Sequence, residues 1–430
     1  MISLENQSEK YSKNRIQDIG NRKNEDAKIS KFMEFKNIDE AMEAAVYYGF
    51  SPVEAPTVEK IDFDRAAGLI EEESAPKDRI VSRPIETSLE EKNFFLRYYA
   101  EKNLIAEPQP IMFSYRNANS SNKSDKQKKS ADKGQSLNLQ IFGSSKSVTE
   151  VILIKTALAL LSDKGIEDVC VGINSIGDKE STNKFVRELA NYYRKNINKM
   201  SPHCRQLFKK DSFSLLECDK QDCCGSLNEE APKAISFLSE PSRQHFKEVL
   251  EGFEILDIPY RINNNLIPDR RHSSHTIFEI TAGGAENKKE IIASGGRYDG
   301  LAKKIGLRKD IPAIGIKISS KKIGGAPIRS KIKTPGFFFL QLGFEAKLKG
   351  LNIIEMLRKA KILVQQSLSR DMLGGQIALA EKMKMPYALI MGKKESMENT
   401  VMVRDMNTRS QETVPVGNLS AYLKKLRGRF

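Results

Sequence analysis

One glycine-rich stretch, Ile291 to Ile318, holds the residue types best suited to forming a ligand site. The apolar run Ile291-Ile292-Ala293 predicts a buried strand, and Ser294-Gly295-Gly296 then predicts a turn. Because glycine has no Cβ, this backbone can approach another group closely. Arg297 follows and leads into a helix-like run. Such a hinge can be a packing device or the floor of a ligand pocket, and the stretch by itself leaves both interpretations open.

Histidine and cysteine side chains are the next candidates, because they ligate metals. His272 and His275 lie close together, but two further ligands at a suitable spacing are absent, so surface histidines are the simpler interpretation. The cysteines of the segment 201–230 do not form two C-x₂-C pairs. We therefore predict no metal site, and free thiols at Cys204, Cys218, Cys223 and Cys224.

Basic side chains form a third group. The chain has 70 Lys and Arg against 56 Asp and Glu, a net charge of +14 that favours a polyanionic partner. Lysines crowd the segment 117–135, and the segment 335–430 holds 16 basic and 8 acidic residues, a net charge of +8. A solvated lysine face would explain either segment alone, but together they favour a surface for a polyanion.

Composition excludes several classes of protein. No apolar run is long enough to span a bilayer, and residues 1–30 are predicted to be a polar, flexible leader without the apolar core of a secretory signal. Five cysteines, an odd number in 430 residues, do not suggest a disulfide framework. We therefore expect a cytoplasmic protein of two or three domains, with no membrane or DNA partner.

Periodicity predicts the elements that position these residues. A helix ends near Gly49, and Val53 to Val58 is expected to be extended. Residues 111–116 and 137–142 predict a hairpin closed by the lysine-rich loop. Residues 201–230 are expected to be irregular. The other elements expected here are helices over 90–104, 148–162, 178–194 and 231–255, strands over 169–173, 276–281, 289–294 and 311–316, and a turn over 174–178.

Residues 324–335 predict a linker, because glycine and proline cluster at both of its ends. Beyond it, strands and helices alternate, which predicts a small α/β domain. The strands are expected over 337–342, 362–364, 387–391 and 401–404, and the helices over 346–359, 372–385 and 418–427.

Nine short strings then occur in one order along the chain: GFSPVEAPTVE, QIFG, INSIGD, EEAPKAISFL, TIFEI, ASGGRYDGL, PAIGI, YALIMG and VMVRDM. In this order they resemble histidyl-tRNA synthetases, which are class II aminoacyl-tRNA synthetases. The resemblance covers nearly everything from Phe32 onward. It implies an α+β fold, with a class II antiparallel-sheet core, a helical insertion, and a C-terminal α/β domain resembling an anticodon-binding domain.

The resemblance also implies a division of the chain and its partners. A leader (1–30) precedes a class II core (31–325, with the insertion at about 180–255), then a linker (326–335) and the anticodon-binding-like domain (336–430). The implied partners are tRNA and a second copy of the chain. In this family a helix and a proline-bearing strand, here the GFSPVEAPTVE unit, form the dimer interface.

Synthetases of this family join histidine to ATP, with Mg, and then transfer the acyl group to tRNA. Charge moves onto the phosphates in the transition state, and the family stabilises it with fixed arginines. In the hairpin strand the family's arginine follows the phenylalanine, but here Ser114 follows Phe113. Arg116, expected on the same face as Ser114, could supply the charge. A solvated arginine beside the basic loop is the simpler interpretation.

Four further positions depart from the family. Pro268 replaces a second arginine, and the segment Ser319 to Lys322 replaces glycine-leucine-glutamate-arginine, so Lys322 keeps only the charge. Ile85 replaces the carboxylate that would hold the substrate α-amino group, although Glu86 could substitute if the loop slips by one residue. Gln140 stands where an acid is usual.

These assignments give three sets of candidate residues. The catalytic candidates, which matter only in an active enzyme with ATP and Mg as cofactors, are Arg116 and Lys322. The expected substrate-binding residues are Glu86, Thr87, Gln140, Gly295, Gly296 and Arg297. The expected RNA-binding residues are Lys126, Lys128, Lys129 and Arg404.

Three functions follow. The first is a synthetase-like protein that binds tRNA and has weakened or lost aminoacylation. The second is a divergent but active histidine–tRNA ligase. The third is a regulatory subunit of a histidine-biosynthesis enzyme, which ranks last because that family lacks the C-terminal domain present here.

Overall fold

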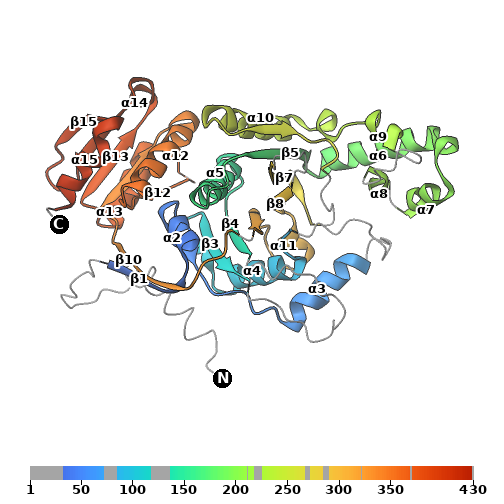
Figure 1. Cartoon of the computed structure of the whole chain (residues 1–430), viewed down its shortest axis with the longest axis horizontal. Coiled ribbons are helices and arrows are strands. Elements are labelled where there is room, and N and C mark those ends of the chain that lie inside the picture. Colours follow the sequence, from blue (N-terminus) through green and yellow to red (C-terminus); the bar gives the residue numbers. More distant parts are fainter. Residues whose placement is uncertain are drawn as a thin grey trace.

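The computed structural model describes residues 32–71, 85–117, 136–210, 212–216, 225–266, 272–283, 290–320, 322–368 and 370–428. The predicted leader and most of the lysine-rich loop lie outside these residues. Three sheets organise the described chain (Figure 1). None of its described helices is both long enough and apolar enough to cross a membrane.

The largest sheet has eight strands in the order β2-β3-β4-β9-β8-β7-β5-β6. Neighbours are antiparallel except at the two edges, where β2 pairs with β3 and β5 with β6 in parallel. The expected antiparallel-sheet core is thus confirmed. Its strands are β2 (Ser51–Pro52), β3 (Ile111–Arg116), β4 (Leu137–Phe142), β5 (Val169–Gly177), β6 (Tyr260–Ile262), β7 (Ser274–Ala282), β8 (Glu290–Arg297) and β9 (Ala313–Ile318).

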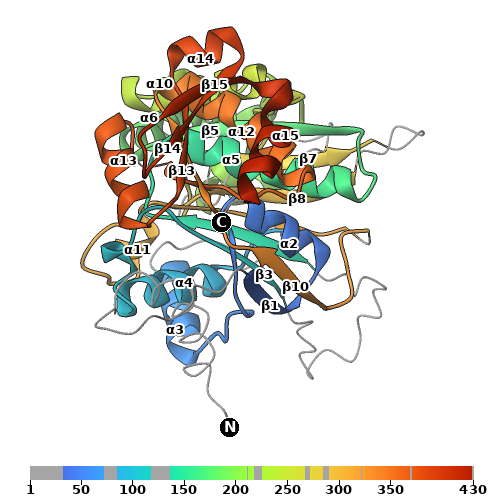
Figure 2. The ribbon, with the colours of Figure 1, turned by 90° about the vertical axis from the view of Figure 1, so that its left-hand side faces the viewer.

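Helices cover both faces of this sheet. On one face α2 (Glu40–Tyr47), α5 (Val148–Asp163) and α10 (Glu240–Ile255) bury apolar side chains in one cluster with Leu139 and Ile316. On the other side lie α3 (Lys60–Glu71), α4 (Leu89–Glu101) and α11 (Leu301–Lys304) (Figure 2). We call this second face the open face. A short 3₁₀ helix, Leu104–Ala106, follows α4.

The insertion forms a separate small core at one end of the molecule (Figure 1). Phe185, Leu189 and Tyr193 lie along one face of α6 (Lys179–Lys195) and are buried in this small core. The segment 201–230, expected to be irregular, instead contains three short helices. The insertion's helices are α6 (Lys179–Lys195), α7 (Pro202–Lys210), α8 (Phe213–Leu216) and α9 (Ser226–Glu229), with 3₁₀ turns at Ile197–Lys199 and Ala234–Phe237.

The C-terminal α/β domain is confirmed as a five-stranded sheet in the order β12-β11-β13-β14-β15. It docks on the core through α12: the Tyr48 hydroxyl donates to Glu355 (2.5 Å), and the Arg358 guanidinium donates to Asp163 (2.7 and 2.9 Å). Its elements are β11 (Phe337–Gln341), α12 (Phe344–Lys359), β12 (Gln365–Gln366), α13 (Leu373–Lys382), β13 (Tyr387–Met391), α14 (Lys393–Glu398), β14 (Thr400–Asp405), β15 (Gln411–Pro415) and α15 (Val416–Arg427).

The third sheet is a two-stranded ribbon that joins distant parts of the chain. Strand β1 (Phe32–Ile38) pairs antiparallel with β10 (Ile328–Lys333). The segment predicted to be a linker therefore contains a strand. Its partner lies about three hundred residues earlier, far outside the reach of any local pattern.

Several local predictions were wrong at element ends. Only Ser51–Pro52 pairs as β2, because Pro52 and Pro56 cannot donate to a ladder. Strand β5 runs through the predicted turn to Gly177, and the strand expected at 362–364 forms at Gln365–Gln366. Helix α14 and strand β15 were not predicted, since both carry mainly polar residues.

The predicted turn at Ser294-Gly295-Gly296 is also wrong, because β8 runs unbroken through Arg297. Gly295 is a packing device: a Cβ there would lie 2.3 Å from the carbonyl oxygen of Gly315 and 2.8 Å from the ring of Phe278. The glycine is needed for the close approach of β7, β8 and β9.

We predict that Gly295→Ala lowers the free energy of unfolding by about 3 kcal/mol, because the added methyl overpacks against backbone that cannot move aside. Gly68→Ala in α3 is the matched control, since a Cβ there meets no atom within 4 Å. It should raise stability by about 0.5–1 kcal/mol. Urea unfolding followed by circular dichroism measures both, and equal stability of the two variants would contradict this packing role.

Candidate functional site

The open face brings together residues from four strands, β3, β4, β9 and β8, which form two groups far apart in sequence. Gln140 of β4 lies opposite Phe113 of β3 and opposite Gly315 of β9, which in turn lies opposite Gly296 of β8. A Cβ on Gly315 would lie 2.0 Å from Gln140 Oε1, so glycine at this position makes room for the amide. The predicted residues Gln140 and Gly296 therefore share one site.

The buried polar groups of this site hydrogen-bond to one another. The Tyr298 hydroxyl donates to Gln140 Oε1 (2.7 Å), and Gln140 Nε2 donates to Thr87 Oγ1 (3.1 Å). Thr87 Oγ1 in turn donates to Asn138 Oδ1 (3.3 Å). Burial raises the pKa of Tyr298 well above its ordinary value, so its hydroxyl keeps its proton. Thr87, predicted to bind substrate, therefore lies in the same network as Gln140.

Glu86 lies beside this network and carries its own partners. Lys92 Nζ donates to Glu86 Oε1 (2.8 Å), and His272 Nε2 lies 3.6 Å from the same oxygen. Lys317 Nζ donates to the Glu86 carbonyl (3.4 Å). Burial alone would raise the pKa of Glu86, but the charge of Lys92 and the contact with His272 hold it well below its ordinary value. The prediction of a surface histidine was wrong for His272, which is buried.

Aromatic side chains occupy the open face over β3. Alternation along the strand places Phe113 and Tyr115 on the face of Gln140, with the Phe95 ring of α4 4.9 Å from that of Tyr115. The Tyr115 hydroxyl donates to Glu91 Oε2 (3.3 Å), and burial together with the charge of Glu91 raises the pKa of Tyr115 well above its ordinary value. The face of β3 beside Gln140 therefore carries an aromatic cluster and not the arginine that the family uses to stabilise the phosphates.

Arg116 lies on the opposite face of β3. Both predictions for it, a charge supplied to the site and a solvated arginine, are therefore wrong. Its Nε donates to Asp39 Oδ2 (2.5 Å), and its Nη2 donates to the carbonyl of Ile323 (2.7 Å). Asp39 also caps the N-terminus of α2. Arg116 is thus neither solvated nor directed into the open face. Lys322 directly precedes Ile323 and is exposed.

Arg297, predicted to bind substrate, is instead a buried structural residue facing α5. Its guanidinium donates to both carboxylate oxygens of Glu150 (2.8 and 2.5 Å), to the carbonyl of Ser144 (3.0 Å) and to Asp299 (3.2 Å). His245 Nε2 lies 2.6 Å from Glu150 Oε1. Burial would raise the pKa of Glu150, but Arg297 and then His245 lower it to about 2. Neither Arg297 nor Gly295, which packs on the same side, contributes to the open face.

Other predicted residues fall elsewhere. Lys126, Lys128, Lys129 and Pro268 lie outside the described residues, as do Cys218, Cys223 and Cys224. Arg404 is half-buried in β14, opposite Ala388 and Gln411. Cys204 was predicted to be free but is disulfide-bonded. Within the described part of the chain, no group of three His, Cys, Asp or Glu side chains is placed to hold a metal ion.

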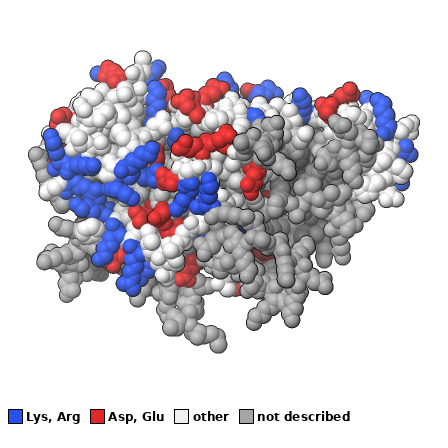
Figure 3. Space-filling view, in the orientation of Figure 1, with Lys and Arg blue, Asp and Glu red and all other residues white. Residues whose placement is uncertain are grey.

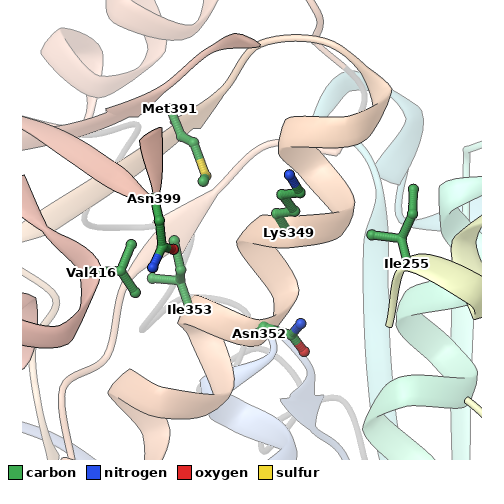
Figure 4. Close-up of a pocket in the computed structure, with 7 residues that line it drawn as sticks. All are labelled: Ile255, Lys349, Asn352, Ile353, Met391, Asn399 and Val416. Atoms are coloured by element: carbon green, nitrogen blue, oxygen red, sulfur yellow. The ribbon is translucent and has the colours of Figure 1, made fainter. Parts of the chain in front are cut away.

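One pocket of about 270 Å³ lies away from the open face, where α10 meets the C-terminal domain (Figure 4). Its Lys349 pairs with Glu345 (2.9 Å) and donates to the carbonyl of Ser396 (3.2 Å). The cation is therefore used within the domain. The pocket is lined by Ile255, Lys349, Asn352, Ile353, Met391, Asn399 and Val416.

Sequence reasoning missed four residues of the site: Asn138, Lys92, Lys317 and Tyr298. Alternation could have found two of them, since Asn138 lies two residues before Gln140 and Lys317 two residues after Gly315. Lys92 and Tyr298 reach the face from α4 and from the end of β8, and no local pattern signals that they meet, with Lys92 Nζ 5.3 Å from the Tyr298 ring centre.

We predict that Glu150→Gln lowers the free energy of unfolding at pH 7 by about 3–5 kcal/mol, because it leaves the Arg297 charge buried without its counter-ion. The double variant Glu150→Gln/Arg297→Met should recover part of this loss, since it removes both charges. A single variant as stable as the wild type in urea unfolding would refute the role of this pair.

The same pair predicts a pH dependence. The folded pKa of Glu150, about 2, lies below its ordinary value of 4.5. Its stabilisation is therefore complete above pH 4.5 and is lost as the pH falls from 4.5 towards 2. The single variant should lack this component when unfolding is measured over that range.

Comparisons with known proteins agree with this fold. Residues 340–426 match the anticodon binding domain family. The chain is 25% identical to a histidine–tRNA ligase of Natranaerobius thermophilus, covering 89% of this chain and 92% of that one. It is 30% identical to the histidine–tRNA ligase of Caldicellulosiruptor bescii, covering 67% and 69%. A solved structure of apo histidyl-tRNA synthetase from S. aureus aligns at 18% identity with a TM-score of 0.47, covering 88% and 92%. At 30% identity over two thirds of a curated relative, with the anticodon binding domain in place, this chain belongs to the histidine–tRNA ligase family.

Proposed function

We propose that this chain binds tRNA and has weak or no ability to form histidyl adenylate. One observation carries the loss of chemistry: the positions of β3 on the same face as Gln140 hold Phe113 and Tyr115, while Arg116 is hydrogen-bonded to Asp39 on the far face. Aromatic rings cannot supply the fixed positive charge that a phosphoryl or adenylyl transition state needs. The chain keeps the fold of the family, but β3 does not present the arginine that would stabilise the phosphates.

Two described cations of this site, Lys92 and Lys317, are already engaged. Lys92 pairs with Glu86 at 2.8 Å, and Lys317 donates to the backbone of Glu86. A phosphate would have to displace these contacts before either lysine could bind it. An ammonium also lacks the two-pronged geometry of a guanidinium. Removing one preorganised donor of this kind typically costs about 10²–10³ in rate.

Binding of tRNA is supported by different observations. The match to an anticodon binding domain covers residues 340–426, and the relatives are named as ligases of tRNA. The segment 335–430 has a net charge of +8, within a chain of net charge +14. Such charge favours a phosphate backbone.

A second copy of the chain is a further proposed partner, by analogy with the family. Six of the eight residues of α2 are buried within this one chain. A homodimer would therefore need the extended segment after α2 or another surface. Light scattering at micromolar concentration distinguishes monomer from dimer.

We predict that histidine-dependent exchange of pyrophosphate into ATP, with Mg²⁺ present, is at least about 10³-fold slower than for an intact histidine–tRNA ligase assayed beside it, because at least two fixed cations are missing. Exchange within tenfold of that enzyme would overturn the loss of chemistry without affecting the proposal of RNA binding.

We predict that labelled tRNA binds with an affinity that falls steeply with salt, because each neutralised phosphate releases counterions. Fluorescence anisotropy between 50 and 200 mM KCl, roughly the range over which such losses are large, gives the slope. Binding of tRNA that is absent at 50 mM KCl, or an affinity that does not change with KCl concentration, would contradict the proposed tRNA binding.

A divergent but active ligase is the second candidate, and the position of Glu86 favours it. The predicted slip of the loop by one residue is compatible with the structure, since Glu86 lies beside Thr87 and His272 and could meet a substrate ammonium. This function would require ATP and Mg. Calorimetry with histidine and with ATP decides: binding of both, lost in Glu86→Gln, would support activity. The regulatory-subunit function ranks third, because that family lacks the C-terminal domain that residues 340–426 match.

A further inference from the structure

We propose that the outer face of the β1–β10 ribbon, continued by the ends of α12 and α15, binds the phosphate backbone of an RNA. The inference rests on the proposed tRNA binding and extends it beyond the anticodon binding domain, whose matched residues are 340–426, to the two ribbon strands. We call this surface the ribbon face; its cations are Lys36, Arg329, Lys331 and Lys333.

The ribbon is amphipathic across its thickness. Met33, Phe35 and Ile332 face inward and join a cluster with Val46 and Tyr47 of α2. In β10 the alternating positions Arg329, Lys331 and Lys333 are exposed while the residues between them are buried. Alternate residues of a strand lie roughly 7 Å apart, so these cations form a regular row on a rigid support.

The charges on this face are unbalanced. The two ribbon strands carry one carboxylate, Glu34, beside the four cations. Glu34 pairs with Lys331 at 2.8 Å. The hydrogen bond and charge of Lys331, with the charges of Lys36 and Arg329, lower the pKa of Glu34. Four cations and one carboxylate leave a net charge of +3.

The basic surface continues onto the C-terminal domain. Lys361 Nζ lies 5.8 Å from the ring centre of Tyr47, and Arg427 Nη1 donates to the carbonyl of Lys361 (2.7 Å). The side chains of Lys359 and Lys361 are 71% and 72% exposed, and they pair with Glu355 (3.5 Å) and Glu43 (3.3 Å). Lys424 and Lys425 lie in the same last turn of α15. Figure 3 shows Lys and Arg side chains gathered on the side of the molecule where Figure 1 places α15 and the ribbon.

This arrangement favours RNA over a lipid surface. Proteins that lie on membranes insert bulky apolar side chains below the headgroups. Here such side chains mostly point into the protein, and the exposed apolar ring in β1 is Phe32, 41% exposed. A rigid row of lysine and arginine instead suits the repeated charges of a phosphate backbone.

The test replaces Lys36, Arg329, Lys331 and Lys333 together by Gln. A matched control replaces four exposed lysines on other elements, Lys102, Lys184, Lys247 and Lys303, by Gln, so both variants lose four charges. Equal thermal melts verify folding. Anisotropy with labelled tRNA is measured from 50 to 200 mM KCl, roughly the range in which backbone contacts are most sensitive.

We expect the ribbon variant to bind tRNA about tenfold or more weakly than the wild type. The slope of log affinity against log salt concentration should become shallower by about 3. The affinity of the control variant should change less than threefold. A ribbon variant that binds like the control would overturn the inference while leaving tRNA binding intact. Wild-type protein that binds no tRNA would overturn the proposed function and this inference together. Binding of phosphatidylserine vesicles that is lost in the ribbon variant, with tRNA binding unchanged, would assign the face to a lipid surface instead.

Discussion

The buried guanidinium of Arg297 is the contact on which the core of this fold depends. It joins the end of β8 to Glu150 in α5 and to the carbonyl of Ser144 after β4. Asp299, which it also contacts, accepts from the backbone of Ala313 at the start of β9 (2.9 Å). A charge with no solvent contact needs this full set of partners, because removing one leaves the rest uncompensated. The orientation of β8 and β9, which carry Gly296 and Gly315, follows from it.

Because side chains alternate along a strand, the register of β3 decides which of its residues lie on the face of Gln140. In β3 a shift of one residue exchanges Phe113 and Tyr115 for Ser114 and Arg116 on the open face. The structure places the aromatic pair there, and Arg116 joins α2 to the segment after β9. The basic side chain is still used, but for holding elements together. The structure therefore keeps the fold of the family while the face of β3 beside Gln140 carries aromatic side chains.

The ribbon joins the segment that precedes the core to the segment that follows it. Strand β1 precedes the core and β10 follows it, and their inner face packs against α2 next to Leu363 of the C-terminal domain. The same contact region holds Tyr48, Glu355 and Arg358. The basic outer surface of the ribbon therefore has a fixed position relative to α12 and α15, which a flexible linker would not provide.

The sequence alone determined the core strands, the C-terminal α/β alternation and the resemblance in motif order, because apolar periodicity and short strings are local properties. It also placed Thr87, Gln140 and Gly296 in one site, through that resemblance. Only the tertiary structure decided which face of β3 looks onto Gln140, that Arg297 serves Glu150, and that Lys92, Lys317 and His272 gather at Glu86. It alone paired β1 with β10. These facts depend on register, burial and contacts between residues distant in sequence, and a local pattern carries none of the three.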